Sequence, residues 1–144
     1  FVEVNYNAGR QTLYIFGEIS CNKTSNEQME KKLLDYGITR SDEITADNSD
    51  KKSIGDFRSW GYRMRPAQKG PGSVETGIKW LCSLRKIIID NRRCPETAKE
   101  FLEYEYERDK NGDVISGYPD MNNHSIDAVR YALEKVIRRR GGGR

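Results

Sequence analysis

Short strand-like runs alternate with helical patterns along this chain, and this alternation restricts its fold more than any other feature. The strand-like runs, rich in β-branched and aromatic residues, cover residues 1–6, 13–19, 43–47, 62–65 and 86–90. Apolar residues at helical spacing follow over residues 25–36, 53–60, 73–84 and from Pro95 onward. The first two runs are joined by turn residues and predict a β-hairpin. Strands that alternate with helices pair in parallel, so we expect an α/β sheet.

Composition excludes several classes of protein. The chain is 35% hydrophobic and 10% aromatic, which is too apolar for a disordered chain. No apolar run approaches the ~18 residues of a membrane span. The 144 residues fit one domain, which we expect over residues 1–140, with a flexible glycine-rich tail over residues 141–144. Three cysteines without zinc-site spacing predict buried free thiols rather than disulfides.

Basic residues gather in two clusters although the net charge is only +3. The clusters comprise Arg58, Arg63, Arg65 and Lys69 in the middle of the chain, and Arg138, Arg139, Arg140 and Arg144 at its end. A solvated surface accounts for most clusters of this kind. Contact with nucleic-acid phosphates is the functional alternative.

Asp47 stands at the carboxyl end of an expected strand, where open α/β sheets place their ligands. Asn48 and Asp50 add further oxygen atoms next to it. The alternative interpretation is purely structural, because Asp, Asn and Ser also favour turns and helix caps. The segment therefore predicts either a ligand site or a simple turn that caps the next helix.

The expected last helix, capped by Asn122 or Asn123 and running to about Arg139, has two distinct faces. An apolar stripe is formed by Ile126, Val129, Leu133, Val136 and Ile137. His124, Asp127 and Tyr131 fall together on roughly the opposite side. The structural alternative is that Asp127 only complements the helix dipole and His124 is a surface residue.

Two carboxylates brought together from separate elements are sufficient to hold a hard divalent cation such as Mg²⁺. Asp47 and Asp127 could supply them, and a pair of ions so held promotes phosphodiester cleavage. The K-G-P-G-S loop at residues 69–73 leads into a helix N-terminus, which suits phosphate contact. The G-x-x-x-x-G-K-[ST] motif is absent, so the chain does not encode a P-loop for ATP hydrolysis.

Three segments, taken in order, resemble the nuclease domain of the large terminase subunit of tailed double-stranded-DNA bacteriophages. They are A-D-N-S-D-K-K-S-I at residues 46–54, K-G-P-G-S at 69–73 followed by Gly77-Ile78, and N-H-S-I-D-A-V-R-Y-A-L at 123–133. The N-H-x-x-D-A-x-R-Y pattern in the third segment is the most specific. The resemblance extends over nearly the whole chain.

This resemblance implies a ribonuclease H-like mixed sheet flanked by helices. It also implies a metal-dependent endonuclease that uses Mg²⁺ or Mn²⁺, two ions in all, and cuts concatemeric double-stranded viral DNA at the initiation and termination of packaging. The implied partners are double-stranded DNA, the terminase ATPase domain, the small terminase subunit and the portal protein. The implied location is the host cell cytoplasm, with no membrane association.

The resemblance also carries residue roles. Its catalytic residues map to Asp47, His124 and Asp127, and its metal ligands to Asp47, Asp127 and Asp50. Among the basic residues, we expect DNA phosphate contacts from Lys69, Arg63, Arg65 and Lys52. For His124 we favour a role in hydrogen bonding or proton transfer over direct ligation, because Mg²⁺ prefers oxygen ligands.

One departure from the family concerns its first catalytic aspartate, on a central strand with a G-x-D-x-G motif ahead of Phe1. That motif is absent here, as is the ATPase domain. We expect an excised nuclease domain that has lost this strand to truncation or disorder, or a catalytically incomplete one. The alternative functions are a Holliday-junction resolvase-like nuclease and a DNA-binding assembly module of the same fold that does not cut.

Overall fold

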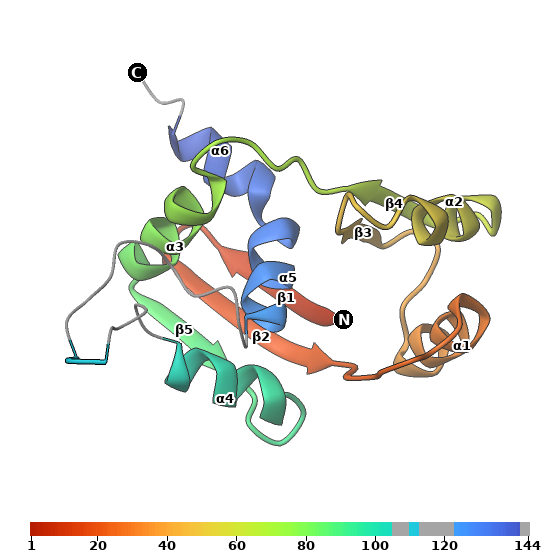
Figure 1. Cartoon of the computed structure of the whole chain (residues 1–144), viewed down its shortest axis with the longest axis horizontal. Coiled ribbons are helices and arrows are strands. Elements are labelled where there is room, and N and C mark those ends of the chain that lie inside the picture. The colour runs from red at the N-terminus through yellow and green to blue at the C-terminus, as the bar shows by residue number, and fades with distance from the viewer. Residues whose placement is uncertain (105–109, 113–122, 142–144) are drawn as a thin grey trace.

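The computed structural model describes residues 1–104, 110–112 and 123–141, in which strands and helices alternate as the sequence predicts (Figure 1). The strands are β1 (Val2–Asn7), β2 (Thr12–Glu18), β3 (Glu43–Ala46), β4 (Arg63–Pro66) and β5 (Lys86–Ile89). The helices are α1 (Asn26–Tyr36), α2 (Lys51–Ser59), α3 (Ser73–Ser83), α4 (Pro95–Glu103), α5 (His124–Ala132) and α6 (Glu134–Gly141).

The strands form two sheets in the described part of the chain. β1 and β2 make the predicted antiparallel hairpin, and β5 adds in parallel to β2, so that the order is β1-β2-β5. β3 and β4 pair in parallel as a separate two-stranded sheet. The predicted parallel pairing is therefore confirmed. Among the described residues, β1 and β3 each keep one edge without a strand partner.

Local sequence signals explain where several helices begin and end. Ser25 caps α1 through a reciprocal capping box with Gln28, and Gly37 ends the helix in the left-handed conformation at φ 97°. Pro95 occupies the first turn of α4, where its missing N–H costs no hydrogen bond. These boundaries match the predicted ones closely.

Each sheet has its own apolar core. The three-stranded sheet packs with α3 and α5 through Leu13, Ile15, Trp80, Leu81 and Val129. The two-stranded sheet packs with α1 and α2 through Leu33, Ile54, Phe57, Tyr62 and Met64. Helix α5 contacts both β1 and β3, so it joins the two halves of the molecule (Figure 1).

The last helix differs from the prediction because it is divided at Leu133 into α5 and α6. The predicted apolar stripe is nevertheless confirmed, since Ile126, Val129, Leu133 and Ile137 are all buried. The division coincides with the burial of Glu134, whose carboxylate accepts hydrogen bonds from the Arg65 guanidinium and the Gln68 backbone. The helical spacing of apolar residues continues past Leu133, so the sequence does not reveal the break in the helix.

The cysteines agree with the expectation only in part. Of the three cysteines, which form no disulfide, Cys94 is buried but Cys21 and Cys82 are exposed, so the expectation of buried thiols is wrong for two of them. Neither cysteine lies on the apolar face of an element, which explains the difference. None of the described helices is long and apolar enough to cross a membrane. Gly141, the first residue of the expected tail, is the last residue of α6, and residues 142–144 lie outside the described residues.

Candidate functional site

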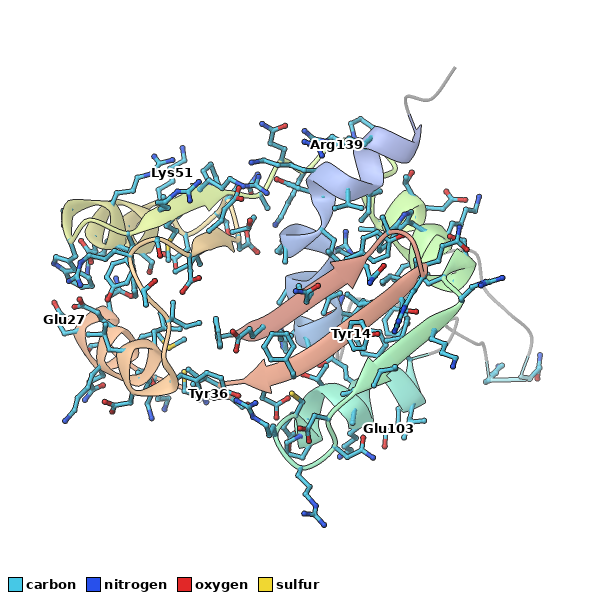
Figure 2. All side chains as sticks on the ribbon, turned by 180° about the vertical axis from the view of Figure 1, so that it is seen from behind. Tyr14, Glu27, Tyr36, Lys51, Glu103 and Arg139 are labelled. Carbon is cyan, nitrogen blue, oxygen red and sulfur yellow. The ribbon has the colours of Figure 1, made fainter. Side chains whose placement is uncertain are left out.

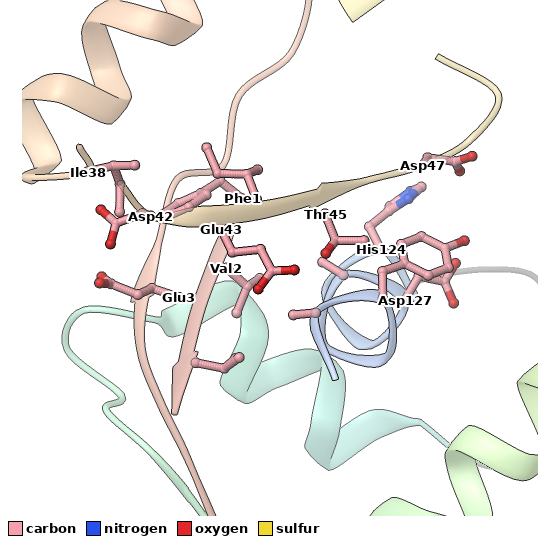
Figure 3. A pocket seen from close by; sticks show the side chains of 15 residues that line it. Phe1, Val2, Glu3, Ile38, Asp42, Glu43, Thr45, Asp47, His124 and Asp127 are labelled. Atoms are coloured by element: carbon pink, nitrogen blue, oxygen red, sulfur yellow. The ribbon is translucent and has the colours of Figure 1, made fainter. Parts of the chain in front are cut away.

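A pocket of about 520 Å³ lies between β1 and β3, and α5 lines it as well (Figure 3). Volumes of this size are typical of ligand sites. Asp47, His124 and Asp127 lie at one end of the pocket, while Glu3 and Asp42 lie at the other (Figure 3). The three catalytic residues that the sequence predicts therefore face one space, although they come from segments far apart in the sequence.

Asp47 directly follows β3, as predicted, and one of its carboxylate oxygens is held firmly. Oδ1 accepts hydrogen bonds from the Ser49 backbone N–H and hydroxyl, each at 2.9 Å, and from Lys69 Nζ at 2.8 Å. The bond from Lys69 is the largest cause that lowers the pKa of Asp47 to about 2. No described residue hydrogen-bonds to Oδ2. Asp47 is thus ionised at neutral pH, with one oxygen left for a ligand.

Asp127 lies in the first turn of α5, and its carboxylate is oriented in a similar way. Arg130 Nη2 donates to Asp127 Oδ1 at 2.6 Å across one helical turn. No described residue hydrogen-bonds to the second oxygen. This end of the pocket therefore has two carboxylates, those of Asp47 and Asp127, each held through one oxygen by a cation of the protein. This arrangement leaves two oxygen atoms that can bind a cation or a water molecule.

His124 is the first residue of α5 and lines the same end of the pocket. Its side chain is exposed, and no described residue hydrogen-bonds to the ring. Asn123 precedes it as the N-cap residue without a side-chain hydrogen bond to the helix. His124 is therefore a surface residue that also faces the pocket.

Asp50 does not line the pocket, although the sequence suggests it as a metal ligand. Its carboxylate accepts a hydrogen bond from Ser53 N at 3.1 Å and caps α2. Asp47 likewise accepts a hydrogen bond from Ser49 N, two residues on, as in an ordinary turn. Asp50 thus caps a helix, as the structural interpretation predicts, whereas Asp47 both shapes the turn and faces the pocket.

The four residues that the sequence suggests for DNA contact occupy different environments. Lys52 is exposed at the start of α2. Arg63 is exposed and donates to the Ser41 carbonyl at 3.0 Å. Arg65 is less available, because its guanidinium binds both Glu43 and Glu134. Lys69 does not line the pocket but pairs with Asp47, which does, and its Nζ lies 5.4 Å from the centroid of the Tyr131 ring.

Sequence reasoning missed three carboxylates that line the pocket, namely Glu3, Asp42 and Glu43. Burial raises the pKa of Glu3, and Asp42 raises it further. Lys135, followed by Arg65, lowers the pKa of Glu43. Glu3 alternates with Val2 and Val4 on an edge strand, and this alternation could have suggested a polar face beside the strand of Asp47.

The side chains that line the pocket fit a divalent cation in part. Among residues 1–104, 110–112 and 123–141, no group of three or more His, Cys, Asp or Glu side chains is gathered closely enough to hold a metal ion. Mg²⁺, however, keeps several waters and is commonly bound by only one or two carboxylates together with substrate phosphates. Asp47 and Asp127 each offer one such carboxylate oxygen to this pocket. A second ion requires further oxygen ligands.

Two curated relatives of this chain are both large terminase subunits. The terminase large subunit of Bacillus phage SPP1 is 38% identical over 146 residues, which cover 98% of this chain and 34% of the relative. The PBSX phage terminase large subunit of Bacillus subtilis (strain 168) is 33% identical over 125 residues, covering 87% of this chain and 28% of the relative. The chain thus spans about a third of the length of these curated relatives.

Solved structures agree in fold. The nuclease domain of the SPP1 large terminase g2p, crystallised with bound Mn, superposes with a TM-score of 0.84 at 36% identity, covering 94% of this chain and 77% of that chain. A large terminase from a thermophilic bacteriophage has a TM-score of 0.71 at 17% identity over 94% of this chain and 36% of its own, which shows the fold alone. Residues 1–135 match the family described as "Terminase RNAseH like domain". The predicted ribonuclease H-like fold is confirmed, and the chain belongs to the terminase RNase H-like domain family.

Proposed function

We propose that this chain is the metal-dependent endonuclease domain of a phage large terminase subunit, which cuts concatemeric double-stranded DNA at the initiation and termination of packaging. One observation carries the proposal. Asp47 and Asp127 face the same pocket from separate elements, and each leaves one carboxylate oxygen without a hydrogen bond from the described residues. Such oxygens suit a hard divalent cation.

The relative with bound Mn supports the use of a divalent cation, Mg²⁺ or Mn²⁺. A pair of such ions, when bound, activates a water and stabilises the leaving oxygen of a phosphodiester. Asp47 and Asp127 would hold the metal, and Asp50 is a weaker candidate because its carboxylate caps α2. His124 would orient the attacking water or transfer a proton, because its ring faces the pocket without a described hydrogen-bond partner.

Basic side chains near the pocket would contact the phosphate backbone of DNA. Lys51 on α2 and Arg139 on α6 lie along the same edge of the molecule (Figure 2). Lys52 and Arg63 are exposed as well, and Lys69 pairs with the pocket residue Asp47. Arg65, bound by two carboxylates, would act mainly through its charge. Contacts of this kind position DNA without reading its sequence.

A third carboxylate would complete the site and allow a second ion. The pocket separates β1 from β3, whose edges are unpaired among the described residues. Unpaired edges accept an added strand through main-chain hydrogen bonds. This arrangement supports an added strand at the pocket, with the aspartate that the family resemblance implies, as a source of that carboxylate.

The partners follow from the family and are part of the proposal. They are double-stranded DNA, the terminase ATPase domain, the small terminase subunit and the portal protein. The relatives that match are large terminase subunits, and this chain spans about a third of their length. Packaging would place the protein in the host cell cytoplasm.

The test is cleavage of supercoiled plasmid by the chain with Mn²⁺, Mg²⁺ or a chelator, and by the variants Asp47→Asn and Asp127→Asn. Asparagine keeps the shape and one acceptor oxygen but removes the charge. We expect nicked and linear products with Mn²⁺ or Mg²⁺, none with the chelator, and none from either variant. Asp35→Asn is the matched control, because Asp35 is exposed on α1 and does not line the pocket.

Two outcomes would contradict the proposal, and a third would favour a rival function. Cleavage by Asp47→Asn at the parent rate would remove this pocket from the chemistry. Binding of DNA without cleavage under any metal condition would favour the assembly module that does not cut. Selective cleavage of four-way junctions over linear duplex would favour the resolvase-like alternative.

A further inference from the structure

Arg130 on α5 is a buried cation beside the pocket. Its side chain is only 7% exposed, and its Nη2 donates to Asp127 Oδ1 at 2.6 Å. Its Nε is buried and has no hydrogen-bond partner among the described residues. Asp127 is its one hydrogen-bonded side-chain partner in that part of the chain.

Stability alone does not account for an arginine in this place. A buried donor without a partner is destabilising, and well-packed apolar residues commonly replace buried ion pairs without loss of stability. The guanidinium instead fixes a carboxylate that faces the pocket. The hydrogen bond from Arg130 therefore orients Asp127, which an apolar residue at this position could not do.

Gly77 on α3 makes the space that Arg130 occupies. A Cβ atom at residue 77 would lie 2.7 Å from Arg130 Cδ and 3.2 Å from its Cγ. Gly77 is buried within a helix, where glycine is less favourable than alanine. The close approach of the arginine stem explains why residue 77 has no side chain.

We infer that Arg130 is a positioning residue for Asp127, and that Gly77 is required because it admits the Arg130 side chain. The inference rests on the proposed function, since it assigns Asp127 to the metal site. It also connects two separate segments of the chain, because Gly77 comes from α3 and Arg130 from α5. Helix α3 thereby controls the orientation of the Asp127 carboxylate through the arginine that lies against it.

The two pocket aspartates differ in their dependence on a cation. Asp47 Oδ1 keeps two hydrogen bonds from Ser49 when Lys69 is absent. The Asp127 carboxylate has no described hydrogen-bond donor besides Arg130. Loss of Arg130 should therefore leave the Asp127 carboxylate without a fixed orientation, which weakens metal binding. Coulomb's law alone predicts the opposite, namely tighter metal binding when a nearby positive charge is removed.

The first experiment measures Mn²⁺ affinity by calorimetry for Arg130→Met and Gly77→Ala. Partners that orient a metal ligand contribute about 10- to 100-fold to affinity, and we expect a loss of that order in both variants. Gly77→Ala keeps the charge of the chain, so its effect is one of geometry. Gly55→Ala is the matched control, because Gly55 is also in a helix and a Cβ there meets nothing within 4 Å.

A double-variant comparison separates positioning from general damage. If Gly77 acts only through Arg130, the variant carrying both Gly77→Ala and Arg130→Met binds Mn²⁺ as Arg130→Met does, without a further loss. Arg130→Lys, which keeps the charge, should recover part of the affinity. Thermal unfolding with a chelator shows that each variant is folded at the temperature of the measurement.

A second experiment needs no metal. In ¹⁵N NMR spectra of the parent, the hydrogen-bonded guanidinium of Arg130 should give a separate, slowly exchanging Nη signal. We expect Asp127→Ala and Gly77→Ala to lose or shift this signal and Gly55→Ala to keep it. An unchanged signal in Gly77→Ala would overturn the inference, as would Mn²⁺ binding by Arg130→Met that equals or exceeds that of the parent.

Failure of the proposed function gives a different result. If Asp127→Ala binds Mn²⁺ as the parent does, or if the parent does not bind it, the metal assignment fails while the guanidinium signal still decides whether Arg130 positions Asp127. If Asp127→Ala loses Mn²⁺ and both Gly77→Ala and Arg130→Met keep it, only the positioning role is wrong.

Discussion

Lys69 Nζ lies 2.8 Å from Asp47 Oδ1, so the loop between β4 and α3 places a positive charge on the carboxylate that follows β3. The same ammonium group lies 5.4 Å from the centroid of the Tyr131 ring on α5. Three separate elements thus meet at one end of the pocket. Because Ser49 also holds Asp47 Oδ1, Lys69 neutralises this carboxylate without being needed to orient it.

Replacement of Lys69 by Gln should strengthen the binding of Mn²⁺. An exposed ion pair contributes roughly 0.2–1 kcal/mol, so we expect an increase in affinity of up to about fivefold, measured by calorimetry at low salt. Lys79→Gln is the control, because Lys79 pairs with Glu75 outside the pocket. DNA cleavage by Lys69→Gln should nevertheless be slower, since the ammonium group is lost as a phosphate contact. Unchanged metal affinity would show that Lys69 does not compete for Asp47.

The pH dependence of Asp47 should change in the same variant. Its pKa is lowered from 3.8 to about 2, with Lys69 as the largest cause, so Lys69→Gln should raise it. A carboxyl group with a lowered pKa stabilises the fold above about pH 4 and loses this contribution as the pH falls towards 2. The gain is small, because the side chains of Asp47 and Lys69 are 44% and 39% exposed. Carboxyl ¹³C NMR titration of the metal-free chain measures the pKa directly, and an unshifted titration in the variant would contradict the assigned cause.

Removal of the Asp127 side chain should destabilise the metal-free protein. Asp127→Ala leaves the buried Arg130 guanidinium without its hydrogen-bonded partner, which typically costs about 1–3 kcal/mol of unfolding free energy. Asp127→Asn keeps an acceptor oxygen and should cost less. Urea unfolding in the presence of a chelator measures both values. Equal unfolding free energies for the parent and Asp127→Ala would mean that Arg130 finds another partner.

His124 should affect the rate of cleavage more than it affects metal binding. We expect His124→Ala to cleave about 10- to 100-fold more slowly, the usual result of losing a positioned hydrogen-bonding group. It should still bind Mn²⁺ by calorimetry at the site that Asp127→Asn loses. Rates are compared with those of the parent between pH 6 and 9. A variant that matches the parent throughout this range would identify His124 as an ordinary surface residue.

Cleavage by the isolated chain should show little sequence preference. Its candidate DNA contacts are exposed basic side chains, and contacts to phosphates carry no sequence information. Mapping of the cut positions on unrelated plasmids should give a broad distribution of products. Discrete bands that recur at one sequence would show that the domain reads bases itself. A salt-dependent loss of activity is expected in either case.

Most of the fold could be predicted because its signals are local. The capping box of Ser25, the proline that starts α4 and the apolar stripe of the last helix each depend on residues close in sequence. Asp47 and Asp127 could be proposed for the same reason, since a strand end and a helix face are local properties. Their convergence on one pocket agrees with this reasoning.

The remaining features depend on how distant elements approach each other. The space that Gly77 provides for Arg130 and the burial of Glu134 arise only when α3, α5, α6 and the segment after β4 are packed. Asp50 shows a different limit, because a helix cap and a metal ligand require the same residue type. Only the position of its carboxylate, turned to Ser53 N, distinguishes them.

Helix α5 lines the pocket and contacts β1 and β3, yet it follows every described strand along the chain. Domains are completed as the ribosome delivers their segments in order, so both sheets are synthesised before the helix that joins them. Until residues near Tyr131 have emerged, Asp47 has no partner across the pocket. A nascent or prematurely terminated chain therefore lacks the proposed cutting site, and only a fully translated domain can become active on DNA.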